Sequence, residues 1–217
     1  MKTLIVWIAL VTLASAASGA AFKQVSFATS DGGQIFANLY GEGSHAVVLA
    51  HGAVFNKESW HTQALQLKER GLKVLAIDFR GYGKSKAGKN GKTLSLDVLA
   101  AIDYLKGQGV EKVSLLGGSM GGRASAEASV ASAPGDIYGF VLIANPPFGS
   151  PQKLKGDKLF IVSEGDGLAA SVKSEFQKAP QPKHLEILEG SAHAQHIFKT
   201  DKAEKLTNLI LDFLTKA

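Results

Sequence analysis

Short apolar segments alternate with segments of helical spacing along most of the chain. Near-continuous apolar runs of about five residues, bounded by Gly, Asp or Asn, are typical of buried strands. Such runs predict strands over residues 22–28, 34–40, 46–50, 72–77, 112–116, 139–144, 158–162 and 184–188. Apolar residues three and four positions apart predict helices over residues 60–70, 94–105, 120–131, 168–177 and 197–214.

From residue 46 onward, several predicted strands are apolar throughout, and they alternate with predicted helices. Strands without polar alternation are buried on both faces, which favours parallel pairing beneath helices. We therefore predict an α/β fold with a mostly parallel, doubly wound sheet. The segments 22–28 and 34–40 predict a leading antiparallel hairpin. The chain between residues 144 and 158 is too short for an inserted cap domain, and its total length predicts one domain over 21–217.

The N-terminus has the layout of a secretory signal. Lys2 precedes an almost wholly apolar run over residues 4–13, and small residues follow it. This order is typical of a signal peptide, and the run is shorter than the roughly 20 residues of a membrane span. We expect a signal peptide over 1–20, cleaved after Ala20, with cleavage after Ala16 or an uncleaved anchor as alternatives. The mature protein would then be exported, periplasmic or secreted, without a stable membrane span.

The charged residues give a formal net charge of +5 and an isoelectric point of about 9.3. No run of five or more basic residues occurs, and the densest basic stretch, 84–92, is interleaved with Gly and Asn. Dispersed lysines are typical of a solvated surface, so we expect no nucleic-acid partner. The chain has no Cys, which excludes disulfides, thiolate metal ligands and a cysteine nucleophile.

The segment Gly117-Gly118-Ser119-Met120-Gly121 matches the pattern G-x-S-x-G. The match alone is weak, since the Gly and Ser content of the chain gives about 0.2 accidental matches. Its position is more specific, because an apolar predicted strand precedes Ser119 and a predicted helix follows it. A nucleophile on so sharp a turn needs small flanking residues, and the helix N-terminus favours developing negative charge. Ser119 is therefore the candidate nucleophile, with a phosphate-binding or merely close-packed turn as the alternative.

A serine hydroxyl needs a base that takes its proton. His193 follows the last predicted strand on a loop of small residues and is the candidate base. His196, three residues later, is the alternative. A metal site built on these two histidines lacks an obvious third ligand, so we expect no bound metal.

The base in turn needs a carboxylate that fixes its tautomer. Asp166 lies in the loop after the predicted strand 158–162 and is the candidate acid, with Glu164 as the alternative. Asp166 could also cap the following helix, a role compatible with the catalytic one. The order Ser119, Asp166, His193 is the nucleophile, acid and base order that accompanies this type of elbow.

Acyl transfer also needs N–H donors for an oxyanion. The Met120 N–H, directly after the nucleophile, is one candidate. The loop after the third predicted strand supplies the other, for which we expect Ala53, with Val54 as the alternative. His51, at the start of this loop, is expected to hold it by hydrogen bonds rather than to transfer protons.

Three motifs in this order resemble the α/β-hydrolase superfamily, and the resemblance covers essentially the whole chain after the signal. They are His51-Gly52, the segment Asp78-Phe79-Arg80-Gly81-Tyr82-Gly83-Lys84-Ser85, and the elbow 117–122. The resemblance implies a Ser-His-Asp mechanism through an acyl-enzyme without a cofactor, and structural roles for Asp78 and Arg80. The chain looks closest to small lidless esterases and dienelactone-hydrolase-like enzymes, with Ser119 where dienelactone hydrolases carry Cys.

We therefore expect a serine hydrolase that acts on small-molecule carboxylic esters. The lack of a lid favours short-chain or polar substrates. Thioesterase, peptidase and acyltransferase activities on the same triad are alternatives, as is a non-catalytic exported binding protein that has kept the fold. The motifs specify neither the acyl and leaving groups nor the oligomeric state.

Overall fold

The computed structural model describes residues 21–216. The expected signal peptide over 1–20 lies outside these residues and stays a prediction. The described strands are β1 (Lys23–Ala28), β2 (Gln34–Tyr40), β3 (His45–Ala50), β4 (Lys73–Ile77), β5 (Lys112–Gly118), β6 (Gly139–Ile143), β7 (Asp157–Ser163) and β8 (Lys183–Leu188). The α-helices are α1 (His61–Glu69), α2 (Ser95–Gly107), α3 (Met120–Ala131), α4 (Ala169–Lys178) and α5 (Ala203–Leu214). Short 3-10 turns form η1 (Lys57–Trp60), η2 (Pro151–Lys153) and η3 (Ala194–Lys199).

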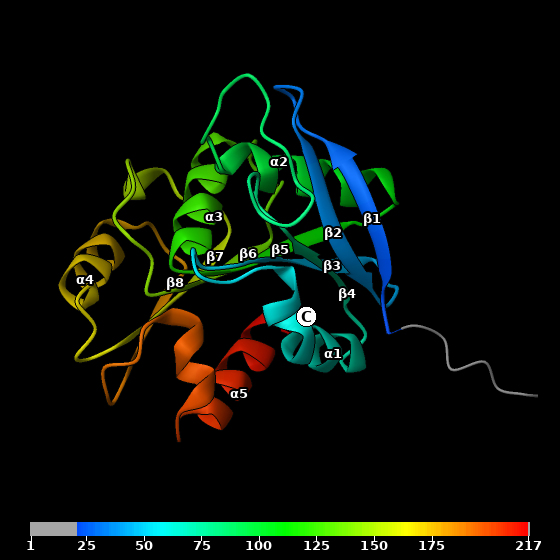
Figure 1. The fold of residues 1–217 in the computed structure, drawn as a ribbon. Coiled ribbons are helices and arrows are strands. Elements are labelled where there is room, and N and C mark those ends of the chain that lie inside the picture. Colours follow the sequence, from blue (N-terminus) through cyan, green and yellow to red (C-terminus); the bar gives the residue numbers. More distant parts are fainter. Residues whose placement is uncertain (1–20, 217) are drawn as a thin grey trace, which may run out of the picture.

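The strands form one sheet in the order β1-β2-β4-β3-β5-β6-β7-β8 (Figure 1). Strands β3 to β8 pair in parallel, whereas β2 pairs antiparallel with both β1 and β4. The predicted mostly parallel α/β sheet with a leading antiparallel hairpin is confirmed. Parallel pairing places the carboxyl ends of β3, β5, β7 and β8 at one edge of the sheet, so the loops that follow these strands meet there.

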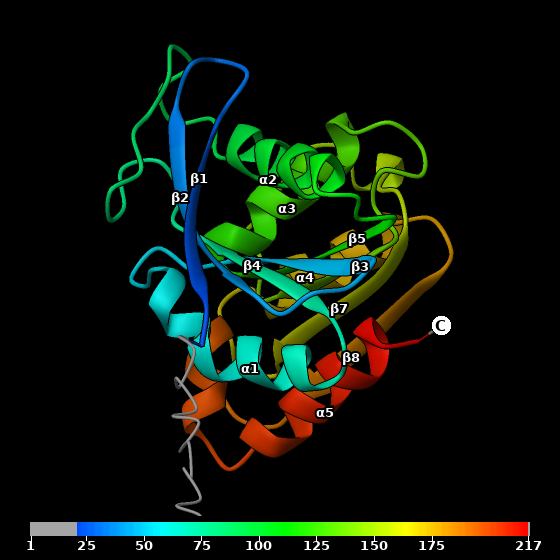
Figure 2. The ribbon, with the colours of Figure 1, turned by 90° about the vertical axis from the view of Figure 1, so that its right-hand side faces the viewer.

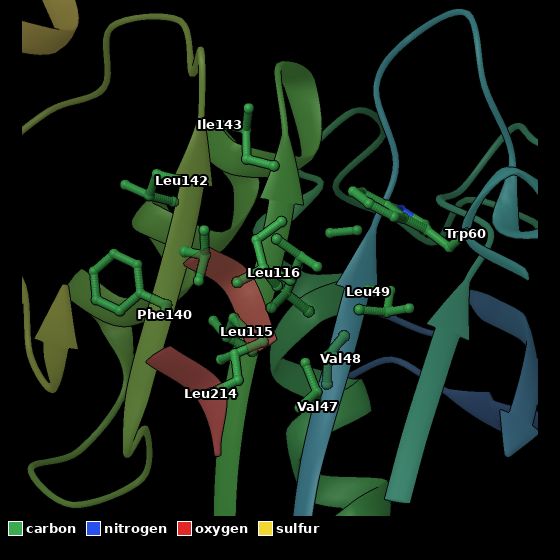
Figure 3. Packing of buried hydrophobic residues seen from close by; sticks show 14 of the residues in the cluster. Val47, Val48, Leu49, Trp60, Leu115, Leu116, Phe140, Leu142, Ile143 and Leu214 are labelled. Atoms are coloured by element: carbon green, nitrogen blue, oxygen red, sulfur yellow. The ribbon is translucent and has the colours of Figure 1, made fainter. Parts of the chain in front are cut away.

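Helices cover both faces of the sheet. Helices α2 and α3 lie on one face and α1 and α5 on the other, while α4 packs against β7 and β8 (Figure 1, Figure 2). The central strands place apolar side chains into both layers, which explains their lack of polar alternation. Fully buried examples are Val47, Val48, Leu49, Leu115, Leu116, Phe140, Leu142 and Ile143 (Figure 3). Among residues 21–216, no helix has the length and apolarity of a membrane span.

The prediction of one helix over 197–214 is wrong, because η3 and α5 are separate elements. Thr200 lies between them with extended backbone (φ −113°, ψ 176°). Its hydroxyl donates to the Ile197 carbonyl (2.8 Å) and accepts from the Lys202 N–H (3.2 Å). Such side-chain bonds compete with the helical backbone bonds and end the helix. The apolar spacing continues across the break because both Ile197 and Leu206 are buried.

The connection between β6 and β7 spans residues 144–156 and contains only the short turn η2. Phe148 in this connection is buried, and its N–H donates to the Glu175 carboxylate at 2.9 Å. Gly149 beside it is exposed, with no atom within 4 Å of the position that a Cβ would take. The connection therefore holds no inserted cap domain, as predicted.

Candidate active site

Loops at the carboxyl edge of the sheet carry the residues singled out from the sequence. Ser119 directly follows β5, and Ala53 lies in the loop after β3. Asp166 follows β7, and His193 lies between β8 and η3. This edge is where α/β proteins with parallel sheets bind their ligands.

Ser119 occupies a tight turn between β5 and α3. Its backbone has φ 50° and ψ −117°, a conformation that costs a non-glycine residue about 1–3 kcal/mol. A Cβ at Gly117 would lie 2.5 Å from the Gly121 carbonyl oxygen, and a Cβ at Gly121 would overlap the Ala50 carbonyl oxygen. The Ser119 N–H donates to the Ile143 carbonyl at 2.8 Å, which ties the turn to β6. Close backbone contact therefore requires these flanking glycines.

The backbone conformation of Ser119 predicts that Ser119→Gly will be more stable than Ser119→Ala. Alanine keeps the Cβ and hence the strain, whereas glycine adopts positive φ readily. Glycine also loses more conformational entropy on folding, by about 0.5–1 kcal/mol. We expect a net difference of about 1 kcal/mol in the free energy of unfolding, measured by urea denaturation of both variants. A glycine variant no more stable than the alanine variant would show that this turn stores no strain.

Ser119, His193 and Asp166 form a hydrogen-bonded line. Ser119 Oγ lies 2.8 Å from His193 Nε2, and His193 Nδ1 lies 2.7 Å from Asp166 Oδ2. A carboxylate oxygen accepts, so Nδ1 carries the hydrogen and Nε2 is left to accept from the serine hydroxyl. The Asp166 side chain is 2 % exposed and that of His193 is 40 % exposed. The imidazole therefore reaches solvent, whereas the carboxylate behind it is shielded.

Hydrogen bonds fix the acid loop and the base loop relative to each other. Asp166 Oδ1 accepts from the Leu168 N–H at 2.8 Å, just before helix α4 begins. The other oxygen, Oδ2, faces His193, so a single carboxylate makes both contacts at once. Ser163 Oγ donates to the Ala192 carbonyl at 2.7 Å, which joins the end of β7 to the loop of His193. The two loops thereby hold the carboxylate and the imidazole at a fixed separation.

The sequence alternatives for acid and base lie elsewhere. Glu164 is exposed, and its backbone N–H donates to the Leu188 carbonyl at 2.8 Å. The His196 ring packs on Phe55, with ring centroids 5.0 Å apart. The structure thus brings together Asp166 and His193 with Ser119, and not these alternatives.

His51 anchors the loop after β3. Its Nε2 accepts from the Phe79 N–H at 3.2 Å, so Nδ1 carries the hydrogen and donates to the Gly52 carbonyl at 2.8 Å. The side chain is fully buried, and this burial lowers the pKa of the imidazole and favours its neutral form. Both nitrogens are occupied by backbone groups, which is the loop-holding role expected from the sequence.

The same loop orients the Ala53 N–H. The Gly52 carbonyl also accepts from the Phe55 N–H at 3.0 Å, and a planar trans peptide points its N–H opposite to its carbonyl. The Gly52–Ala53 peptide is therefore fixed, while Tyr82 Oη donates to the Ala53 carbonyl at 2.9 Å. Within residues 21–216, neither the Ala53 nor the Met120 N–H donates to another protein group. Both N–H groups are free to bind a ligand oxygen.

Sequence reasoning overlooked two side chains at this edge. Tyr82 Oη lies 3.8 Å from Met120 Sδ as well as within hydrogen-bond distance of the Ala53 carbonyl. Gln195 is buried, and its Oε1 accepts from the Gly52 N–H at 2.7 Å. The available signal for Gln195 was a polar side chain two residues after the candidate base, between the apolar residues Ala194 and Ile197, both of which are buried.

A buried ion cluster supports the segment 78–85. Arg80 is 4 % exposed and donates to Asp97 (Nε to Oδ1, 2.8 Å) and to Asp31 (Nη1 to Oδ2, 2.8 Å). Hydrogen bonds from Arg80 hold the pKa of Asp31 well below its usual value, whereas burial raises the pKa of Asp97. Asp78 accepts from Lys57 Nζ at 2.6 Å. These contacts give Arg80 and Asp78 structural roles.

Known proteins share parts of this sequence. The model of the family Hydrolase_4, described as "Serine aminopeptidase, S33", matches residues 41–181. The non-heme chloroperoxidase of Streptomyces lividans is 32 % identical over 155 residues, which cover 70 % of this chain and 52 % of that protein. A 2-hydroxy-6-oxononadienedioate/2-hydroxy-6-oxononatrienedioate hydrolase of Klebsiella pneumoniae is 33 % identical over 134 residues, 58 % of this chain and 46 % of that protein. The chain thus spans about half the length of these relatives.

Solved structures share the fold. An esterase of Pyrococcus furiosus superposes with a TM-score of 0.77 at 18 % identity, covering 89 % of this chain and 91 % of that one. The enol-lactonase of Burkholderia xenovorans LB400 gives 0.72 at 18 % identity, covering 88 % and 100 %. The family match spans more than half of the chain and includes Ser119 and Asp166. The chain therefore belongs to the Hydrolase_4 family and is an α/β-hydrolase.

Proposed function

We propose that this hydrolase cleaves carboxylic esters with Ser119 as nucleophile, His193 as general base and Asp166 as the carboxylate that orients the imidazole. The proposal rests on the line of hydrogen bonds from Ser119 Oγ to His193 Nε2 (2.8 Å) and from Nδ1 to Asp166 (2.7 Å). In this geometry Ser119 Oγ attacks the ester carbonyl carbon while Nε2 takes its proton. The shielded carboxylate then stabilises the imidazolium that forms.

The oxygen of the tetrahedral intermediate needs donors that are already in place. The N–H groups of Ala53 and Met120 are assigned this role. Neither donates to a protein group in the described part of the chain, and Met120 begins helix α3. Collapse of the intermediate breaks the bond to the alkoxy group, which leaves with the proton from His193. Water activated by His193 then attacks the acyl-enzyme and releases the acid.

The connection between β6 and β7 supports short or polar substrates. It contains only the short turn η2 and no inserted cap domain, so it provides no lid under which a long acyl chain could be enclosed.

A fluorophosphonate probe, together with a chain-length series of p-nitrophenyl esters, tests the proposal. We expect the wild type to be labelled and to hydrolyse acetate and butyrate esters faster than the palmitate ester. Ser119→Ala should do neither. His196→Ala is the matched control, because it removes a nearby histidine outside the hydrogen-bonded line, and it should keep both properties. Equal labelling of wild type and Ser119→Ala, or a wild type without esterase activity, contradicts the proposal.

The family description favours peptide amides as the second candidate substrate. The same residues would act, but His193 would have to protonate an amine leaving group that is more basic than an alcohol. An aminoacyl p-nitroanilide compared with the p-nitrophenyl esters separates the two. A kcat/KM in the usual enzymatic range of about 10⁴–10⁸ M⁻¹s⁻¹ on the anilide alone would favour the peptidase.

A further inference from the structure

We propose that Gln195 is a positioning residue that holds the oxyanion loop, defined as residues 51–55, in register with Ser119 and His193. The inference rests on the proposed function, since it concerns the rate of that reaction. It extends that function to a side chain outside the triad and the oxyanion donors. The observation behind it is that one buried side chain, two residues after His193, contacts both the oxyanion loop and the turn that carries Ser119.

The Gln195 amide is bonded at both ends. Oε1 accepts from the Gly52 N–H at 2.7 Å, and Nε2 donates to Ser59 Oγ at 2.9 Å. Because the Gly52 N–H is a donor, it must face the amide oxygen, and this fixes the orientation of the amide. Ser59 Oγ in turn donates to the Asn56 carbonyl at 2.5 Å. The residue is 4 % exposed, and its bond to the Gly52 N–H is buried, so water has little access to that bond.

The same side chain packs against the turn of the nucleophile. A Cβ at Gly118 would lie 3.2 Å from Gln195 Cγ and 3.7 Å from Ala194 Cβ. Gly118 directly precedes Ser119, so Gln195 Cγ lies against the backbone that carries the nucleophile. Its contact with Gly52 then connects this turn to the oxyanion loop.

The backbone turn at Ala194 makes the side chains of His193 and Gln195 point in different directions. Ala194 is buried and has φ 47°, a conformation uncommon for residues other than glycine. The His196 N–H closes this turn by donating to the His193 carbonyl at 2.9 Å. His193 therefore reaches Ser119 while Gln195 reaches Gly52. The base and the loop of the oxyanion donor are thus positioned from adjacent points of one rigid turn.

The Gly52 N–H is already bonded to Gln195. The next N–H along the loop, that of Ala53, is therefore left to bind the substrate oxygen. Without Gln195, the Gly52 N–H loses its partner, and the loop keeps only the bonds to the Gly52 and Ala53 carbonyls from His51, Phe55 and Tyr82. We expect the N–H side of the loop to shift as a result. A displacement of about 1 Å at a catalytic group lowers the rate about 100-fold. The ester oxygen takes up full negative charge only on the way to the intermediate, so the loss falls on kcat rather than on KM.

Gln195→Met tests the inference, because methionine keeps the length of the side chain and removes both hydrogen bonds. We measure kcat and KM for p-nitrophenyl acetate per active site titrated with the fluorophosphonate. We expect kcat to fall about 10- to 100-fold, with KM within about threefold of the wild-type value. The pH profile of kcat/KM should keep its shape, since no ionisable group is removed. Ser59→Ala is the matched control, because it leaves the bond to Gly52 in place, and its kcat should stay within about threefold of wild type.

Gln195→Asn is the second variant, since it keeps the amide but is one methylene too short to reach Gly52, and it should behave like Gln195→Met. A wild-type kcat per titrated site in both variants overturns the inference. A loss explained wholly by fewer titratable sites or by a raised KM also overturns it. If neither variant folds, amide hydrogen exchange of the wild type is measured instead. We expect the Gly52 N–H to exchange slowly. Fast exchange at Gly52 would contradict the inference. A wild type that neither reacts with the probe nor hydrolyses esters overturns the proposed function instead.

Discussion

Ser119→Ala is expected to lower kcat for ester hydrolysis by about 10⁴- to 10⁶-fold, with little change in KM. The substitution removes the proposed nucleophile, while the proposed oxyanion donors, the N–H groups of Ala53 and Met120, remain. Those donors and substrate binding still leave a rate above that in water. Stopped assays of p-nitrophenyl acetate hydrolysis measure the loss. The variant is purified on fresh resin to exclude carry-over of wild-type protein.

The double variant Ser119→Ala/His193→Ala sharpens this expectation. In the proposed mechanism, His193 moves the protons of Ser119, of the leaving group and of the water that attacks the acyl-enzyme, and each of these steps needs Ser119. Removal of His193 from the serine variant should therefore change kcat by less than about threefold. Each single variant should show nearly the full loss. Losses that multiply in the double variant would mean that His193 acts independently of Ser119 and would contradict the triad.

Arg80→Met is expected to lower the free energy of unfolding by about 3–5 kcal/mol. Methionine roughly fills the space of the arginine stem but leaves the fully buried Asp97 without its guanidinium partner. A buried charge without a partner is among the largest single destabilising changes. Urea denaturation measures the change, with Lys84→Met as the matched control. Lys84 is an exposed base of the same segment, and its replacement should change stability by no more than about 0.5 kcal/mol. A similar, small change in both variants would contradict the structural role of Arg80.

Arg80 is also expected to contribute to the response of the protein to acid. Its hydrogen bonds hold the pKa of Asp31 well below the ordinary value of 3.8. A carboxyl group with a lowered pKa in the folded state contributes stability above its ordinary pKa, and this contribution is lost as the pH falls through the folded value. The contribution of Asp97 to the pH dependence of stability has the opposite sign, because burial raises the pKa of this carboxyl group. Wild type should therefore lose stability below about pH 4, and Arg80→Met should lose less. Equal urea-midpoint losses between pH 7 and pH 3 would contradict this.

The fold and the candidate triad were accessible from the sequence for one physical reason. Strands buried on both faces leave runs of apolar residues, and parallel pairing brings the loops after such runs to one edge of the sheet. Ser119, Asp166 and His193 each follow a recognisable strand, so their proximity could be expected without coordinates. The glycines around Ser119 strengthened this expectation, because close backbone contact excludes other residues there.

Other features depend on side-chain contacts that leave no periodic signal. Thr200 ends a helical turn through two local hydrogen bonds while the apolar spacing continues past it. Gln195 bonds to a backbone group 143 positions away in the chain. Nothing in the residues around Gln195 indicates that partner. The sequence does not separate Ala53 from Val54 as the second oxyanion donor either, because that choice depends on peptide orientations in the loop that leave no signal in the sequence.

The connection between β6 and β7 bears on how substrate selectivity could be built into this scaffold. Phe148 anchors its first part to the core, whereas Gly149 next to it is exposed and surrounded by open space. Exposed points of this kind tolerate insertions, since no packed group or backbone bond need be broken. New chain grafted there would emerge after β6, the strand adjacent to the one that carries Ser119. Selectivity could thus evolve or be engineered as an added module, leaving the residues that perform the chemistry untouched.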